Sequence, residues 1–151
     1  MNKIESFKIN HLKLEPGFYI SRKDGDITTF DMRFIKPYSG ALLSNSEMHS
    51  FEHMFATYIR NSELSEDVIY FGPMGCQTGF YLLMRNADYC SVLSEVKDTL
   101  KKITEHRGDV FGNSEKECGN CYSLNLASAK EISRKYLEIL NNSVNTGAYE
   151  E

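Results

Sequence analysis

The chain has 151 residues, which is the usual length of one domain, and its 21 acidic and 17 basic residues give a net charge of −4. It contains no cluster of basic residues of the kind that binds nucleic acid, and no run of about 18 apolar residues that would span a membrane. The first residues also lack the apolar core of a signal peptide. We therefore expect one domain over residues 1–151, located in the cytoplasm with its cysteines reduced.

Four segments have the composition of strands, and turn residues separate them. In the first hairpin, Lys23-Asp24-Gly25-Asp26 is a typical turn. In the following strand, Asp31 and Arg33 alternate with apolar residues, so we expect one buried and one exposed face, with Arg33 on the face opposite Phe34. The four predicted strands are 18–22, 30–34, 68–71 and 80–84.

Three segments have the apolar spacing of helices. The first, over 47–60, follows possible capping residues at 44–46, and Asp88 is placed to cap the second. The third covers 126–140, a polar stretch at 107–122 separates the last two helices, and the residues from about 142 to 151 are expected to form a flexible tail. Together these elements predict an α+β fold in which a mainly antiparallel sheet packs against about three helices.

The most informative motif is His49-Ser50-Phe51-Glu52-His53 in the first predicted helix. Residues four apart lie on one helix face, so His49 and His53 can offer two imidazoles to one metal ion. Glu52 lies beside them, where it can act as a general base or orient a ligand. A third ligand must come from elsewhere, and Cys118 and Cys121 are equally suitable by spacing. One of these thiolates would complete a three-ligand site with an open position, the arrangement of catalytic zinc.

A second candidate site is the thiol of Cys76. It lies in a predicted turn between Gly75 and Gly79, and these glycines allow a close approach of backbone or ligand. A thiol near a cation can exchange protons near neutral pH. Cys90, in the second helix, has no such surroundings and is interpreted as a packing residue.

Several segments of this chain together resemble the LuxS family of S-ribosylhomocysteine lyases. The H-x-x-E-H motif alone is weak, but its combination with the turn and with Cys118-Gly119 is highly specific. The matching segments are Glu5-Ser6-Phe7, Asn10-His11, Phe30 to Phe34, His49 to His53, Pro73 to Tyr81 and Asn113 to Gly119.

The resemblance implies a set of site residues and a metal. His49, His53 and Cys118 would bind one divalent cation per subunit, Fe²⁺ natively, with Zn²⁺ or Co²⁺ also possible. Cys118 is chosen over Cys121 because the ligand in the family directly precedes a glycine. The resemblance also implies a homodimer with active sites at its interface. Four positions correspond to substrate-binding residues: Ser6, His11 and Arg33 near the sugar, and Arg60 at the homocysteine end.

The implied activity is cleavage of the thioether in S-ribosylhomocysteine. The homocysteine sulfur does not leave until a carbonyl acidifies the proton next to the carbon that bears the sulfur. The carbonyl must therefore first migrate along the sugar through enediolates, with the help of the metal. β-Elimination then gives homocysteine and 4,5-dihydroxypentane-2,3-dione, the precursor of the quorum-sensing signal autoinducer-2. Cys76 and Glu52 are the candidates for the proton transfers.

Three positions depart from the family pattern. Tyr70 stands where an acidic residue is usual, and Thr29 stands where a basic residue is common. Both positions concern recognition of the homocysteine end of the substrate. Cys121 is an additional thiol close to the proposed ligand.

Two other functions fit the same motif. H-x-x-E-H is also the inverted signature of zinc peptidases, in which the glutamate activates water. Alternatively, the cation would serve only as a structural clip, which requires a closed shell of four ligands.

Overall fold

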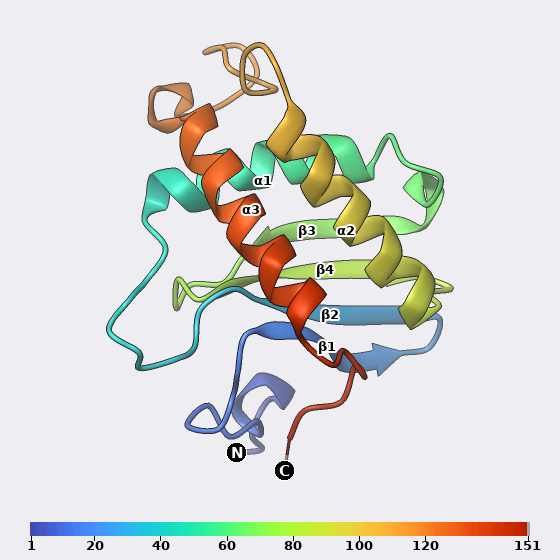
Figure 1. The fold of residues 1–151 in the computed structure, drawn as a ribbon. Helices are drawn as coiled ribbons and strands as arrows, with labels where there is room; N and C mark the ends of the chain where they lie inside the picture. Colours follow the sequence, from blue (N-terminus) through green and yellow to red (C-terminus); the bar gives the residue numbers. More distant parts are fainter. Residues whose placement is uncertain (151) are drawn as a thin grey trace.

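The structure, a computed structural model, describes residues 1–150, which form a four-stranded antiparallel sheet with three helices on one of its faces (Figure 1). The strands run in the order β1-β2-β4-β3, so β2 and β4 lie in the centre. These elements agree with the α+β fold that the sequence predicts. The strands are β1 (Gly17–Asp24), β2 (Ile27–Arg33), β3 (Val68–Pro73) and β4 (Gly79–Arg85), and the helices are α1 (Asn45–Ile59), α2 (Tyr89–Glu105) and α3 (Leu126–Asn142). Three short 3₁₀ turns are η1 (Glu5–Phe7), η2 (Ser65–Asp67) and η3 (Cys121–Ser123).

The two hairpins depend on particular glycines. Gly25 turns β1 into β2 with a φ of +62°, a conformation that glycine adopts readily. Gly79 begins β4 opposite Arg33 of β2. A Cβ atom at Gly79 would lie 2.3 Å from the carbonyl oxygen of Met32, so only glycine lets β2 and β4 approach this closely here.

The helix that carries the H-x-x-E-H motif begins at a complete capping box. The amide of Glu47 donates to the Ser44 hydroxyl at 3.1 Å, and the amide of Ser44 donates back to the Glu47 carboxylate at 2.9 Å. The apolar residues of α1 recur at helical spacing and are buried: Met48, Phe51, Phe55 and Ile59. The motif residues His49, Glu52 and His53 are therefore left at the margin of the buried face.

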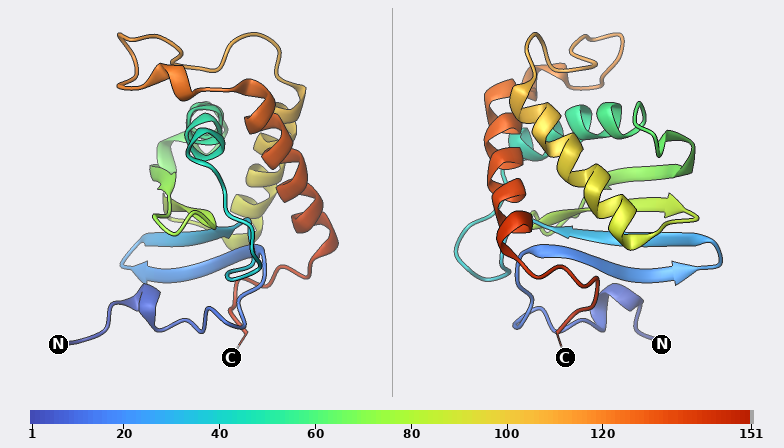
Figure 2. Two further views of the ribbon diagram at one scale, coloured as in Figure 1. Left: turned by 90° about the vertical axis from the view of Figure 1, so that its left-hand side faces the viewer. Right: turned by 45° about the vertical axis from the view of Figure 1, so that its right-hand side comes forward.

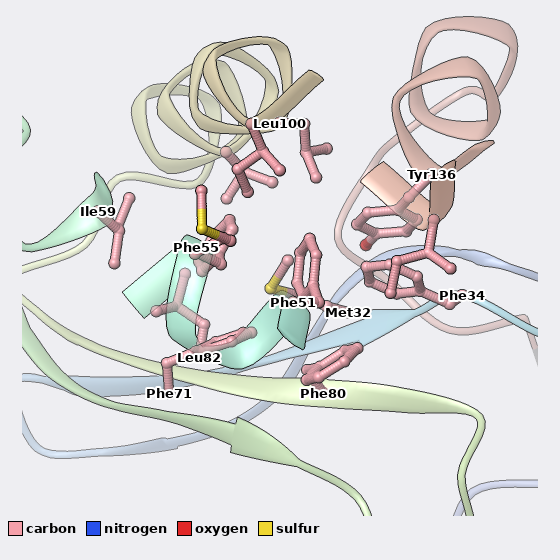
Figure 3. Packing of buried hydrophobic residues seen from close by; sticks show 14 of the residues in the cluster. Met32, Phe34, Phe51, Phe55, Ile59, Phe71, Phe80, Leu82, Leu100 and Tyr136 are labelled. Atoms are coloured by element: carbon pink, nitrogen blue, oxygen red, sulfur yellow. The ribbon is translucent and has the colours of Figure 1, made fainter. Parts of the chain in front are cut away.

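The core lies between this helix layer and the sheet, and aromatic rings form much of it (Figure 3). Phe80 of β4 stacks on Phe71 of β3 with their centroids 5.2 Å apart, and its ring also lies 4.9 Å from that of Phe51. At the other side, Phe34 stacks on Tyr136 of α3 at 3.9 Å. These contacts fix α1 and α3 on the sheet.

The outer face of β2 differs from the prediction. The alternation in this strand predicts an exposed face for Asp31 and Arg33, but their exposed fractions are 0% and 1%. The reason lies outside the strand. The segment after α3, for which the sequence suggested a flexible tail, runs back along β1, and the carbonyl of Gly147 accepts from the amide of Ile20 at 2.7 Å. Figure 2 shows the N-terminal segment and the segment that follows α3 near this edge of the sheet.

Cys90 also departs from its interpretation as a packing residue. It lies in the first turn of α2 and is exposed. Helix α2 instead buries Val92, Val96, Leu100 and Ile103, which recur at helical spacing. None of the helices within residues 1–150 combines the length and the apolar character needed to cross a membrane.

Candidate functional site

The structure brings the two imidazoles of α1 together with one thiol from the loop before α3. The ligand atoms of His49, His53 and Cys118 all lie within 4.8 Å of one another, and each residue is half-buried. The Nε2 atom of His49 is 3.3 Å from the Cys118 sulfur. Cys121 is outside this group and is buried at the start of η3. The geometry thus distinguishes two thiols that are equivalent by spacing.

Both imidazoles are oriented by hydrogen bonds at Nδ1. For His49, the partner is the hydroxyl of Ser123 at 2.6 Å, and this hydroxyl donates in turn to the carbonyl of Asn120 at 3.2 Å. For His53, the partner is the carbonyl of Phe111 at 2.7 Å. A carbonyl only accepts, so His53 Nδ1 carries the proton, and the Ser123 arrangement favours the same tautomer in His49. The Nε2 lone pairs of both rings are therefore free for a cation.

Several independent features of His49, His53 and Cys118 are compatible with a bound divalent cation. Metal–nitrogen and metal–sulfur bonds of ordinary length at a tetrahedral angle place nitrogen and sulfur roughly 3.6 Å apart, close to the observed 3.3 Å. Burial, with the charge of His53 as the smaller cause, lowers the pKa of His49, which favours the neutral imidazole that a metal ligand needs. The backbone amide of Asn120 donates to the Cys118 sulfur at 3.4 Å and would stabilise a thiolate.

Close backbone approach helps to build this site. Gly112 has a φ of +70°, and a Cβ atom there would be 3.0 Å from His53 Nδ1. Glycine therefore lets the loop reach the imidazole and place the Phe111 carbonyl.

Glu52 lies one residue before His53 and is about half-buried. Burial raises the pKa of its carboxyl group, and the nearby charge of His53 opposes the shift. A raised pKa makes a carboxyl group a better proton carrier near neutral pH, so Glu52 is suited to general acid–base work.

The Cys76 thiol lies in the β3–β4 turn and is exposed. Its sulfur is 3.1 Å from the hydroxyl of Thr78 and 3.9 Å from Nη1 of Arg33, which also donates to Thr78 at 2.8 Å. Burial lowers the pKa of Arg33, but the charge of Asp31 and the hydrogen bonds to Asp31 raise it by more, so the pKa of Arg33 lies above its usual value. Arg33 is therefore a fixed cation beside the thiol.

Cys76 and Thr78 line a cavity of about 380 Å³ on the surface. His11 also lines it, and its Nδ1 contacts the carbonyl of Ile9 at 2.9 Å. The rim is largely apolar and includes Tyr38 and Leu42, whose exposed fractions are 84% and 59%. None of the three candidate metal ligands lines this cavity within residues 1–150.

The remaining predicted substrate-binding residues lie in separate places. Ser6 is half-buried in η1. Arg60 is exposed at the end of α1 and donates to the carbonyl of Ile69 at 3.4 Å.

Tyr70 and Thr29, two of the positions that depart from the family pattern, lie on the sheet. The ring of Tyr70, 54% exposed, lies over Gly72, where a Cβ atom would come within 2.2 Å of its hydroxyl. Thr29 is half-buried in β2 and paired with Leu83.

Sequence reasoning missed the residues that support these groups. Asp31 belongs to an alternating strand and to a segment that resembles the LuxS family, but the sequence assigns it no role, although its position two residues before Arg33 places both side chains on one face. Ser123 and Tyr149 carry no sequence signal, because each acts through a partner distant in the chain. Thr78 belongs to the turn that resembles the family, but the sequence does not indicate its contact with Arg33.

The comparisons with known proteins agree with this geometry. A family model described as S-Ribosylhomocysteinase (LuxS) matches residues 4–146. The chain is 48% identical over 147 residues to the S-ribosylhomocysteine lyase of Finegoldia magna, with 94% of each chain covered. It is 42% identical over 149 residues to that of Clostridium acetobutylicum (94% of each chain) and 44% identical over 149 residues to that of Porphyromonas gingivalis (93% of each). These matches do not favour the zinc-peptidase alternative. With the His₂Cys cluster in place and similarity along nearly its whole length, the chain belongs to the LuxS family.

Proposed function

We propose that this protein is a carbon–sulfur lyase that cleaves S-ribosylhomocysteine to homocysteine and 4,5-dihydroxypentane-2,3-dione. The observation that carries this conclusion is the cluster of His49, His53 and Cys118 ligand atoms, with both Nδ1 atoms engaged elsewhere, in a chain of the LuxS family. Its relatives bear the name of this activity.

His49, His53 and Cys118 would hold one divalent cation. Two imidazoles and a thiolate accept Fe²⁺, Co²⁺ and Zn²⁺, and we propose Fe²⁺ as the native ion. When bound, the cation supplies Lewis acidity that stabilises negative charge on the sugar oxygens. Three protein ligands leave a coordination position open, as catalytic sites require.

Cys76 and Glu52 are proposed to move the protons. Carbonyl migration requires a base that takes a proton from one sugar carbon and returns it to the next, and a second group that exchanges protons with the oxygens. In the last step, a proton leaves the carbon next to the carbonyl, the electron pair forms a double bond, and the carbon–sulfur bond breaks. The sulfur leaves with the electron pair of that bond and is protonated to homocysteine. Cys76, beside Arg33, and Glu52, with its raised pKa, have the appropriate chemistry.

Four further residues are proposed to hold the substrate. His11, which lines the cavity, Ser6 in η1 and Arg33, which is buried beside Cys76, would contact the sugar. Arg60, which is exposed, would bind the carboxylate of the homocysteine end.

We further propose that two copies of the chain associate and that the active site lies between them. The cavity with Cys76 and the cluster with His49 are lined by different residues, so a substrate contacting both needs them brought together. The exposed apolar side chains around the cavity supply a surface that a second copy would cover. We also infer a cytoplasmic location, because the cysteines are free thiols.

A thiol-release assay tests the activity. Protein reconstituted anaerobically with Fe²⁺ should release homocysteine from S-ribosylhomocysteine, and Cys118→Ala should not. Absence of release by the loaded protein would refute the lyase, and cleavage of peptides would favour the peptidase.

Mixing two inactive variants tests the shared site. Cys76→Ala and His53→Ala, each inactive alone, should regain up to about a quarter of the activity when unfolded and refolded together, because half of the dimers are mixed and each contains one complete site. No recovery in dimers shown to be mixed would mean that each site is built from a single chain.

A further inference from the structure

The hydroxyl of Tyr149, in the segment after α3, donates to Oδ2 of Asp31 at 2.7 Å. The two residues are 118 positions apart in the chain. Burial, with the charge of Asp31 next, raises the pKa of Tyr149, so the phenol remains a hydrogen-bond donor. The segment after α3 therefore places one neutral donor on a buried carboxylate.

Asp31 holds Arg33 through two further bonds. Nε of Arg33 donates to Oδ1 at 3.1 Å and Nη2 donates to Oδ2 at 2.7 Å, which is a bidentate fork. The exposed fractions of the two side chains are 0% and 2%. A buried pair is stable only when its remaining lone pairs are satisfied, and Tyr149 satisfies one of them.

The same guanidinium reaches the reactive turn. Its third nitrogen, Nη1, bonds to Thr78 and lies 3.9 Å from the Cys76 sulfur. A continuous chain of polar contacts thus runs from Tyr149 through Asp31 and Arg33 to Cys76.

Tyr149 is itself firmly placed. Its ring stacks on that of Tyr19 with centroids 4.8 Å apart and an angle of 18° between the planes. Gly147, two residues earlier, accepts from the amide of Ile20 and has a φ of +81°. A Cβ atom at Gly147 would lie 2.9 Å from the ring of Tyr89, so this turn depends on glycine.

We propose that Tyr149 is a positioning residue for the thiol site. Its hydroxyl completes the hydrogen bonding of Asp31, which fixes the guanidinium of Arg33 against Thr78 and Cys76. The link to turnover rests on the proposed function, but the effect on Cys76 does not require that function.

Tyr149→Phe tests this proposal, because it keeps the stacked ring and removes only the hydroxyl. In the full chain loaded with Zn²⁺, we expect Cys76 to react with iodoacetamide about 2- to 10-fold more slowly, the effect expected from one hydrogen bond. A looser guanidinium stabilises the reactive thiolate less. Exposed Cys90, followed in the same sample by peptide mass spectrometry, should keep its rate. The exchange of the Arg33 Nε proton, followed by NMR, should become faster.

Tyr19→Phe is the matched control. Its hydroxyl donates to the carbonyl of Glu15 at 2.8 Å, so this variant loses a nearby hydrogen bond without touching Asp31. It should leave both the Cys76 rate and the Arg33 signal unchanged. An unchanged or faster Cys76 reaction in Tyr149→Phe, an equal loss in Tyr19→Phe, or an equal loss at Cys90 would each overturn the proposal.

Turnover gives a separate measurement. On S-ribosylhomocysteine, Tyr149→Phe should lower kcat by a similar factor, because the variant alters a proton-transferring thiol, and any rise in KM through the proposed sugar contact of Arg33 should accompany this fall in kcat. A rise in KM alone would contradict the positioning of Cys76. If neither variant nor the unmodified protein turns over this substrate, the proposed lyase fails, while the alkylation and NMR results still decide the role of Tyr149.

Discussion

The Nε2 atom of His49 lies 3.3 Å from the sulfur of Cys118, although 69 residues separate them in the chain. Helix α1 supplies the nitrogen and the loop before α3 supplies the sulfur. Contacts between Ser123 and α1 hold this loop: the Ser46 hydroxyl donates to the Ser123 carbonyl at 2.6 Å, and the Ser123 hydroxyl contacts His49. The candidate metal site is therefore a tertiary structure that depends on the packing of one loop against one helix.

This relationship predicts different effects for two neighbouring thiols. The loss of a hydrogen bond to a metal ligand typically weakens metal binding by about 10- to 100-fold. Cys118→Ala removes a proposed ligand itself, so it should weaken the binding of Zn²⁺ or Co²⁺ by more than this. Cys121→Ala should retain the affinity, since that sulfur is buried outside the cluster. Competition with a chromophoric chelator measures both. Equal losses in the two variants would show that Cys121 is a ligand.

Ser123→Ala removes the hydrogen bond that orients His49 while leaving all three ligands. We expect metal affinity to fall by about 10- to 100-fold, because the imidazole loses its fixed tautomer and orientation. Ser143→Ala, which removes a hydroxyl from the far end of α3, serves as the control. If the Ser123 variant binds as tightly as the control, the hydroxyl does not orient the ligand.

Glu52→Gln should retain metal but lose turnover, because an amide cannot carry the proton. The stability of the metal-free protein gives a second, pH-dependent signature. Burial raises the pKa of Glu52 in the folded state, so the folded state binds this proton more tightly than the unfolded state does. Ionised Glu52 therefore destabilises the fold at neutral pH, and the variant should have the higher Tm there.

The difference in Tm should shrink as the pH falls through the raised pKa, since the wild-type side chain then becomes neutral as well. Thermal melts of both proteins from neutral to acidic pH measure it. A difference that does not change with pH would mean that the charge of Glu52 is not the cause.

Gly79→Ala tests the close approach of the two central strands. A Cβ atom 2.3 Å from the Met32 carbonyl forces the backbone apart, and we expect a loss of about 1–3 kcal/mol or more in the free energy of unfolding. Gly75→Ala, in the same turn, meets no atom within 4 Å and should change stability little. Urea denaturation compares the two. Similar values for both would show that the turn relaxes without cost.

Local sequence signals predicted most of the fold. The possible capping residues at 44–46 predicted the start of α1, where the structure has Ser44 as the cap, and the helical spacing of the apolar residues predicted the face that carries His49 and His53. The pair of imidazoles was predictable for the same reason, since residues four apart share a helix face.

The parts that could not be predicted from the residues alone depend on contacts between distant segments. Spacing did not separate Cys118 from Cys121, because the choice depends on how Ser123 packs on α1. Alternation in β2 suggested an exposed Arg33, but a segment more than a hundred residues later covers Asp31. Neither contact leaves a periodic or compositional signal in the chain.

The loop at residues 106–122 joins the fold in two ways: Val110 and Phe111 pack against the core, and the Phe111 carbonyl and Cys118 contact the two histidines of α1. A ligand that binds only the folded state stabilises the protein, and this stabilisation grows with the logarithm of the ratio of ligand concentration to Kd. If a cation binds at His49, His53 and Cys118, its removal should therefore make this loop more sensitive to proteases. Limited digestion with and without a chelator, followed by mapping of the first cut, would reveal such a coupling.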